Sequence, residues 1–132
     1  MGAVKESAYI PGTCNINSEE IAQRRKLGHI FLVVSVLALL ALVLLKMDSW
    51  YRLLLFPIYA IALSCYQQAR SKFCVSYGSS GIQNADEGSK SASNIQSERF
   101  KKLDQDKARK MNTLSVLGGV LIALVTLLIP EA

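Results

Sequence analysis

The sequence predicts an all-α integral membrane protein with three transmembrane helices, a helical hairpin plus a third span, and a polar cytoplasmic segment. Residues 30–45 contain only Ser35 as a polar residue, and residues 114–129 contain only Ser115 and Thr126. A helix in a soluble domain keeps a polar face toward water, and neither run has one. The Lys and Arg residues are also distributed unequally around these runs, as proteins that span membranes require.

The first helix is predicted over residues 18–46, with a transmembrane span at about 28–46. Asn17 stands three residues before Glu20, a pairing that favours a helix start near Ser18. Residues 1–17 before it are expected to form a mobile cytoplasmic tail that a Pro11-Gly12 turn ends. This tail lacks the apolar core of a cleaved signal peptide, and Glu6 stands where myristoylation requires Ser or Thr.

Residues 47–49 are too few for anything but a tight external turn, and a second span is predicted over 50–66. This segment carries Arg52 near its start and Pro57 inside it. We expect the long side chain of Arg52 to reach the lipid head groups. Trp50 and Tyr51 are the amphipathic aromatic residues that favour the membrane interface.

Residues 67–111 form the long polar segment, which is expected to be cytoplasmic. Residues 67–73 extend the second helix, whereas 78–93 are rich in Gly, Ser and Asn, a composition that predicts a loop without a folded core. Ser93 with Gln96 favours a helix start, so a basic helix is predicted over about 94–111. It either lies along the membrane surface or runs directly into the third span, 112–130, which Pro130 closes.

The distribution of Lys and Arg residues predicts the orientation of the chain in the membrane. Of the fifteen Lys and Arg residues, four precede the first span, nine lie in the polar segment and only Lys46 and Arg52 lie on the turn side. This distribution places the amino terminus and the polar segment in the cytoplasm and the carboxyl terminus outside. The net charge of +5 is concentrated beside the spans, which indicates anionic lipid rather than nucleic acid as a partner.

Two groups of residues are candidate contact sites. Small residues recur on one face of the third span and favour close helix packing, either within the chain or in a homo-oligomer: Ser115, Gly118, Gly119 and Ala123. The candidate contacts to lipid or to a membrane protein partner are Arg70, Lys72, Cys74, Lys101, Lys102, Lys107, Arg109 and Lys110. No cofactor or metal is expected, because His29 is the only histidine and the three cysteines have no ligand spacing.

Part of the second span and the residues after it carry a family resemblance. Trp50 and Arg52 open that span, and Gln68-Ala69-Arg70 is followed shortly by Cys74. The stretch from Trp50 to Gly81 resembles small bacterial inner-membrane proteins that have three predicted spans. The resemblance implies this topology and an inner-membrane location, and it points to residues 68–81 for a binding role. It implies no mechanism.

The sequence favours a non-catalytic accessory or scaffold protein that contacts lipid or a partner protein. About half of the 132 residues belong to spans, which leaves no room for a catalytic domain of ordinary size. No Asp, Glu or Lys lies deep within a span, so a transporter is disfavoured. Two alternatives stay open: a holin-like pore former, and a membrane sensor that acts through an acylated or redox-active thiol at Cys74.

Overall fold

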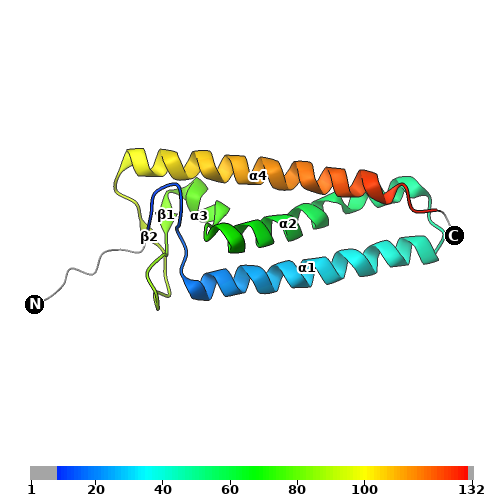
Figure 1. Ribbon diagram of the computed structural model, residues 1–132, viewed down its shortest axis with the longest axis horizontal. Helices are drawn as coiled ribbons and strands as arrows, with labels where there is room; N and C mark the ends of the chain where they lie inside the picture. The colour runs from blue at the N-terminus through cyan, green and yellow to red at the C-terminus, as the bar shows by residue number, and fades with distance from the viewer. Residues whose placement is uncertain (1–8, 131–132) are drawn as a thin grey trace, which may run out of the picture. The chain divides into compact units, whose positions relative to one another are not determined.

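The computed structural model describes residues 9–130, which are mostly helical and belong to two compact units (Figure 1). The head unit comprises residues 1–23 and 68–111, and the helical unit comprises residues 24–67 and 112–132. The elements in chain order are α1 (Ser18–Leu44), the 3₁₀ helix η1 (Ser49–Leu55), α2 (Phe56–Ser71), α3 (Val75–Ser80), β1 (Ile82–Gln83), β2 (Ser93–Asn94) and α4 (Glu98–Thr126).

Helix α1 begins where the sequence predicts. The side-chain oxygen of Asn17 accepts a hydrogen bond from the Glu20 backbone N–H at 3.1 Å, which satisfies a donor that the first helical turn leaves free. The helix ends at Leu44, and Lys46 turns the chain with a positive φ of 56°. The predicted short turn between the first two apolar segments is therefore confirmed.

The second predicted span consists of two helical elements. Residues 49–55 form η1 and residues 56–71 form α2. Pro57 lies in the first turn of α2, where a backbone N–H has no partner within the helix, so it begins this helix without interrupting it. At the turn side, the rings of Trp50 and Tyr51 stack with centroids 4.1 Å apart.

The head unit corrects two predictions. Residues 9–17 are not a mobile tail, because Asn15, Ile16 and Asn17 are buried, while residues 1–8 lie outside the described part. Residues 78–93 are not an unstructured loop either. They include the end of α3 and the strand β1, which pairs antiparallel with β2 through Ile82–Asn94 and Gln83–Ser93, and Ala85 is buried. The apolar core of this unit is Phe73, Ala108 and Met111.

Helix α4 is one uninterrupted helix of 29 residues. The second of the two predicted alternatives therefore holds, since the basic stretch continues directly into the apolar one. The predicted start is wrong by four residues: Ser93 belongs to β2, and Ser97 accepts a hydrogen bond from the Phe100 N–H at 3.3 Å. Pairing with β1 holds residues 93–94 extended, which prevents the Ser93–Gln96 cap from forming.

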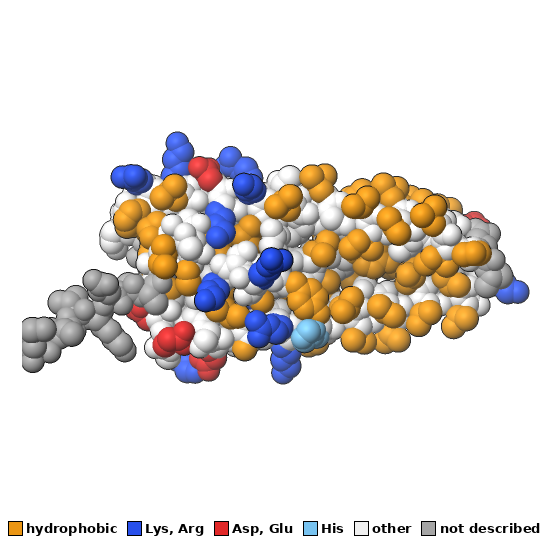
Figure 2. All heavy atoms as spheres, in the orientation of Figure 1, with side chains coloured by type: hydrophobic (Ala, Val, Ile, Leu, Met, Phe, Trp, Pro, Cys, Tyr) orange, Lys and Arg blue, Asp and Glu red, His pale blue; other side chains and the backbone are white. Residues whose placement is uncertain are grey.

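The helical unit exposes its apolar residues. Within the described part, α1 and α4 are the two helices long and apolar enough to cross a membrane, and only 11% and 28% of their apolar windows are buried. Leu, Val and Ile side chains cover the face of this unit seen in Figure 2. The interior holds small apolar residues such as Ala62 and Ala123 together with four polar ones, Ser35, Arg52, Ser115 and Thr126.

Candidate functional site

The predicted contact residues all lie in the head unit, and five of them are exposed. Arg70 stands in the last turn of α2, and Lys72 follows it with a positive φ of 55°. Lys102, Arg109 and Lys110 are exposed on α4, together with Arg99, which the sequence analysis did not single out. Lys and Arg side chains are scattered over the visible surface of this unit (Figure 2). This surface can attract anions without enclosing a pocket for one.

Lys101 and Lys107 are only half exposed. Lys101 forms an ion pair with Glu98 one turn earlier, at 3.2 Å, and its side-chain carbons lie against Gly81. The Lys107 ammonium lies 5.0 Å from the centre of the Phe73 ring and donates to the Thr13 carbonyl at 3.2 Å. Burial lowers the pKa of Lys107, against the opposing effect of nearby Asp104 and Cys14. These two lysines therefore stabilise the head unit.

Asp104 joins the amino-terminal segment to α4. Its side chain is fully buried, and its two carboxylate oxygens accept hydrogen bonds from the Gly12 backbone N–H at 2.6 Å and the Tyr9 hydroxyl at 2.8 Å. Burial, then the hydrogen bond to Asp104 and its charge, raise the pKa of Tyr9 above its ordinary value. The phenol thus stays protonated and keeps donating to Asp104.

Asparagine side chains hold the rest of the head unit. Asn15 bonds in both directions with the Cys74 backbone, donating to its carbonyl at 3.1 Å and accepting from its N–H at 2.6 Å. Asn17 donates to the carbonyls of Asp86 and Ser89. Asn84 donates to Glu20, which also accepts from the Tyr77 hydroxyl at 2.7 Å. Amides can imitate backbone pairing, so these side chains replace regular strands in fixing the loop.

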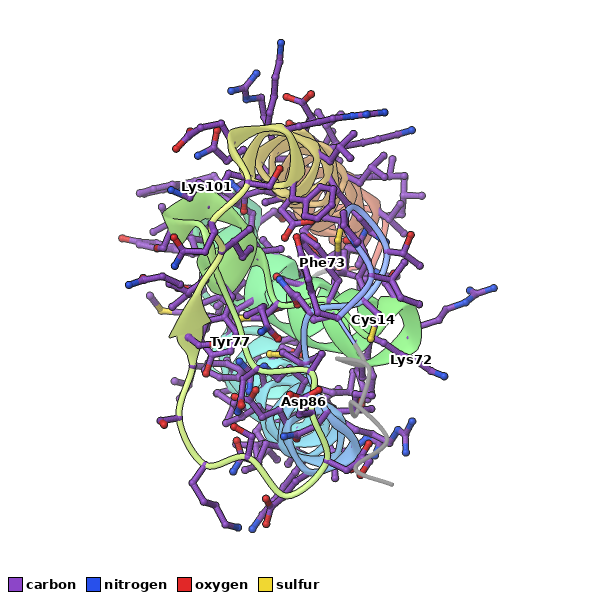
Figure 3. The ribbon with its side chains drawn as sticks, turned by 90° about the vertical axis from the view of Figure 1, so that its left-hand side faces the viewer. Cys14, Lys72, Phe73, Tyr77, Asp86 and Lys101 are labelled. Carbon is purple, nitrogen blue, oxygen red and sulfur yellow. The ribbon has the colours of Figure 1, made fainter. Side chains whose placement is uncertain are left out.

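Cys74 is buried, whereas the thiol-sensor alternative requires an accessible thiol. Only 3% of the residue is exposed, and it precedes α3 beside fully buried Phe73. Figure 3 shows Phe73 in the interior of the head unit and Lys72 at its edge. A thiol must reach solvent or the bilayer surface to be oxidised or acylated. The geometry therefore gives the thiol-sensor alternative no support.

Arg52 does not reach the head groups, which corrects a second prediction. It is 1% exposed, and its guanidinium donates to the Thr126 carbonyl at 2.8 Å and the Ile129 carbonyl at 2.6 Å. Thr126 is the last residue of α4, and Ile129 lies in the turn that follows, where the Ile129 N–H also donates to the Thr126 carbonyl at 3.1 Å. Arg52 therefore adds to the backbone hydrogen bonds at the carboxyl end of α4, while its Nε atom stays buried without a hydrogen bond.

The predicted small residues lie against α2. A methyl group at Gly119 would come within 2.8 Å of the Phe56 carbonyl oxygen, and one at Gly118 within 2.7 Å of a Leu63 methyl group. Ser115 donates to the Gln67 side chain at 2.9 Å, and Ala123 is buried. Across α1 and α2, His29 and the Tyr66 hydroxyl are 2.6 Å apart. In this chain the small face is used within the helical unit.

Sequence reasoning missed the residues that shape the head unit, namely Tyr9, Asn15, Asn17 as a loop anchor, Asn84 and Asp104. A usable signal was the Asn15-Ile16-Asn17 run, in which two amides flank one apolar residue before a helix. The site assembled by these residues is a basic surface on a small scaffold held by polar contacts. Within residues 9–130, no group of three His, Cys, Asp or Glu residues is placed to hold a metal ion.

The fold and this surface define a mostly helical protein with two helices that could cross a membrane and a small polar unit. Comparisons with protein-family models, with curated proteins and with solved structures found no match. The resemblance of residues 50–81 to small three-span bacterial proteins stays a prediction.

Proposed function

We propose that this chain is a small non-catalytic membrane protein with three spans, in which the head unit is cytoplasmic and serves as an accessory or scaffold. The observation that carries the proposal is the exposed apolar surface of the helical unit. Leu, Val and Ile side chains face outward, while Ser35, Arg52, Ser115 and Thr126 are inside. Contiguous apolar surface of this extent is costly in water and favourable in lipid, and small or polar residues join helices there.

The third span of the proposal is η1 with α2. Helix α2 has 16 residues, but together with the seven of η1 it supplies 23 helical residues. Arg70 lies in the last turn of α2, whereas Arg52 lies in η1, and its hydrogen bonds to the Thr126 and Ile129 carbonyls reduce the cost of placing it at membrane depth.

The basic head unit supports contact with anionic lipid head groups or with an acidic membrane partner. Its exposed cations on α4 directly precede the apolar part of that helix in the chain. Juxtamembrane Lys and Arg residues each contribute roughly 1 kcal/mol near an anionic surface. A scaffold role needs such a surface and no enclosed active site.

Two measurements test the proposal. Alkaline carbonate washing should leave the protein in the membrane pellet, and release into the supernatant would contradict membrane integration. Crosslinking and pull-down from native membranes should recover a stable companion that the triple variant Lys102→Gln, Arg109→Gln, Lys110→Gln loses and Lys46→Gln retains. If the wild type repeatedly returns alone, the scaffold role is wrong. Retention of anionic phospholipid by the wild type, and less by the triple variant, would then leave lipid as the contact.

A further inference from the structure

The helical unit has an apolar hollow, open along one side, between α1, α2 and α4. Its volume is about 240 Å³, and no residue of its lining carries a charge. On α1 the lining runs from Leu32 to Leu39, and on α2 it runs from Tyr59 to Tyr66. Seven residues of helix rise roughly 10 Å, so the hollow extends along the helices.

The hydroxyl groups around the hollow are already paired or buried. Ser35 and Thr126 donate to backbone carbonyls of their own helices, at 2.7 and 2.6 Å. The Tyr66 hydroxyl lies 2.6 Å from Nδ1 of His29, and the Tyr59 hydroxyl oxygen is buried. Tyr59 therefore lines the hollow with the carbon atoms of its ring. A polar group placed here would lose its hydration without compensation, so the hollow suits a hydrocarbon chain.

The size and depth of the hollow match one lipid chain. A cavity of about 150 Å³ holds benzene, so about 240 Å³ holds roughly ten carbon atoms. A helix, with a diameter of roughly 10–12 Å including its side chains, is too wide for this space. Leu32 and Leu39 lie roughly 6 and 16 Å along the helix from the start of the predicted span 28–46. Half of a hydrocarbon core is roughly 15 Å thick, so the hollow lies in the leaflet that α1 enters first.

Basic residues precede the hollow on the same stripe of α1. Leu32, Val36 and Leu39 line the hollow. His29 and Arg25 continue this series toward the start of the helix, at steps of three and four residues. Residues with this spacing share one helix face. Both are exposed, and α1 has no Asp or Glu after its first turn. An anionic group at this end of the hollow would therefore meet basic residues without a competing carboxylate of α1.

Tyr66 positions His29 at this end of the hollow. The His29 Nδ1 atom lies 2.6 Å from the Tyr66 hydroxyl, and the two rings meet edge to face with centroids 5.3 Å apart. Gly28 permits this contact, since a methyl group there would come within 3.1 Å of the Tyr66 ring. Nε2 is the ring nitrogen left for a further partner, and it carries a proton whenever Tyr66 donates to Nδ1. His29 can then donate to an anionic oxygen.

We propose that the hollow binds one acyl chain of an anionic phospholipid, whose phosphate contacts Arg25 and His29. The chain fills the space lined by Leu32, Val36 and Leu39, and the phosphate lies where α1 enters the bilayer. This site deepens the proposed lipid contact by placing it on the helical unit, and it rests on the proposed membrane placement.

Photolabelling of the full-length protein in vesicles tests the site. The vesicles are phosphatidylcholine with a trace of phosphatidylglycerol whose acyl chain carries a diazirine at its middle, and mass spectrometry locates the label. Phosphatidylcholine with the same diazirine is the comparison probe. Leu63 lines the hollow, whereas Ile61 is exposed on α2 outside it. The phosphatidylglycerol probe should label Leu63 about fivefold more than the phosphatidylcholine probe does, because a nearby cation favours the anionic lipid. Ile61 should show no such preference.

Two pairs of variants isolate the site. Val36 is 49% exposed and Leu37 is 60% exposed, so a larger side chain fits at either position without overpacking the interior. Val36→Trp fills the hollow and should abolish the preference at Leu63, whereas Leu37→Trp, outside the lining, should keep it. Arg25→Gln should lower phosphatidylglycerol labelling of Leu63 to the phosphatidylcholine level. Lys26→Gln, an equal loss of charge at an exposed residue of the neighbouring stripe, should not.

Labelling of Ile61 reports on membrane placement alone, so the two proposals fail separately. If Ile61 is labelled but Leu63 shows no preference, or if Val36→Trp keeps the preference, the site is wrong and the placement stands. If Lys26→Gln removes the preference as fully as Arg25→Gln, general surface charge replaces the proposed site. If neither Ile61 nor Leu63 is labelled, the placement fails and the site with it. Labelling of Leu63 that appears only after dilution of the protein in the vesicles would assign the hollow to a second copy of the chain and overturn the proposal.

Discussion

At the residue scale, Arg52 is buried rather than exposed at the surface, because it has hydrogen-bond partners inside the helical unit. A buried cation is costly, but the Thr126 and Ile129 carbonyls accept hydrogen bonds from the guanidinium and reduce this cost. Backbone hydrogen bonds from Leu127, Leu128 and Ile129 to the last carbonyls of α4 end that helix, and Arg52 adds two side-chain bonds there. A residue of η1 therefore contributes to the far end of the chain.

Replacing Arg52 by Met should destabilise the helical unit. The substitution supplies an unbranched apolar side chain but removes both guanidinium hydrogen bonds and leaves the Ile129 carbonyl without this donor, at a cost of about 1–3 kcal/mol for a buried acceptor. Denaturant unfolding of the detergent-purified protein measures it. Lys46→Met removes an exposed cation from the same turn and should change stability little. Equal stabilities of the two variants would show that the guanidinium contacts contribute nothing.

Gly78 occupies a position with no space for a side chain. A methyl group there would lie 2.7 Å from the Phe73 ring and 3.0 Å from the Asp104 carbonyl. Gly78→Ala should therefore destabilise the head unit by about 1–3 kcal/mol, despite the better helix propensity of alanine. Ser79→Ala, at an exposed neighbour in α3, is the control. Hydrogen exchange of the α3 amides compares the variants, and unchanged protection in Gly78→Ala would disprove the close packing.

The stability of the head unit depends on pH through the carboxylate of Glu87. Its carboxylate accepts hydrogen bonds from the Ser18 hydroxyl and backbone N–H, and these two bonds lower its pKa below the ordinary 4.5. A lowered pKa means that the contact stabilises the fold above pH 4.5 and is lost as the pH falls through the lowered value.

Carbon-13 NMR titration of the Glu87 carboxyl should accordingly give a midpoint below 4.5 in the wild type. Ser18→Ala removes the stronger of the two bonds and should return the midpoint toward the ordinary value. Glu98 pairs with Lys101 and has no contact with Ser18, so its carboxyl signal should not respond to the substitution. An identical Glu87 midpoint in both proteins would exclude the Ser18 hydroxyl as the cause.

At the scale of elements, α2 and α4 approach closely because two residues of α4 at their contact are glycines without side chains. The two glycines of α4 differ in what they face. Gly119 faces the backbone of α2, at Phe56 and Ala60, whereas Gly118 faces the tip of the Leu63 side chain. Backbone cannot move without displacing its helix, but a Leu side chain can change rotamer.

Gly119→Ala should consequently destabilise the helical unit more than Gly118→Ala. Both substitutions add the same methyl group to the same helix, so their difference isolates the contact with α2. We expect a difference of about 1–3 kcal/mol, the usual effect of overpacking. Thermal unfolding in detergent provides the comparison. If Gly118→Ala proves equally disruptive, close backbone approach is not what fixes these helices together.

Local signals in the sequence were sufficient for some elements. The Asn17 cap and the short connection between Leu44 and Ser49 depend on neighbours in the chain, and both were predictable. The head unit was not, because its bonds join distant residues: Tyr9 and Asp104 are 95 positions apart, and Asn15 and Cys74 are 59 apart. Composition rules out a large apolar core, but it does not reveal asparagine pairs that fix a loop. The role of Arg52 was hidden similarly, since its acceptors lie 74 and 77 residues away.

At the scale of the whole molecule, the number of spans determines on which side of the membrane each terminus lies. Helices α1 and α4 are long and apolar enough to cross a membrane. The count is three if η1 with α2 also crosses it, and two if it does not. An even number of crossings returns the carboxyl terminus to the side of the amino terminus, and an odd number leaves it opposite. With three spans, thirteen cations lie on one side and two on the other, which favours a cytoplasmic amino terminus. With two spans, eleven cations would lie between the spans and four before the first, which favours a cytoplasmic polar segment and an external amino terminus.

Reporters fused at the two termini therefore distinguish three spans from two. With three spans, green fluorescent protein before Met1 should be bright in the cytoplasm, and alkaline phosphatase after Ala132 should be active, because it folds only outside the cytoplasm. A second phosphatase fusion after Gly88, within the polar segment, should be inactive and serves as the cytoplasmic reference. With two spans the termini share one side, so an active phosphatase after Ala132 would accompany a dark fluorescent protein at the amino terminus. That outcome would remove η1 and α2 from the membrane, while leaving α1 and α4 as its anchors.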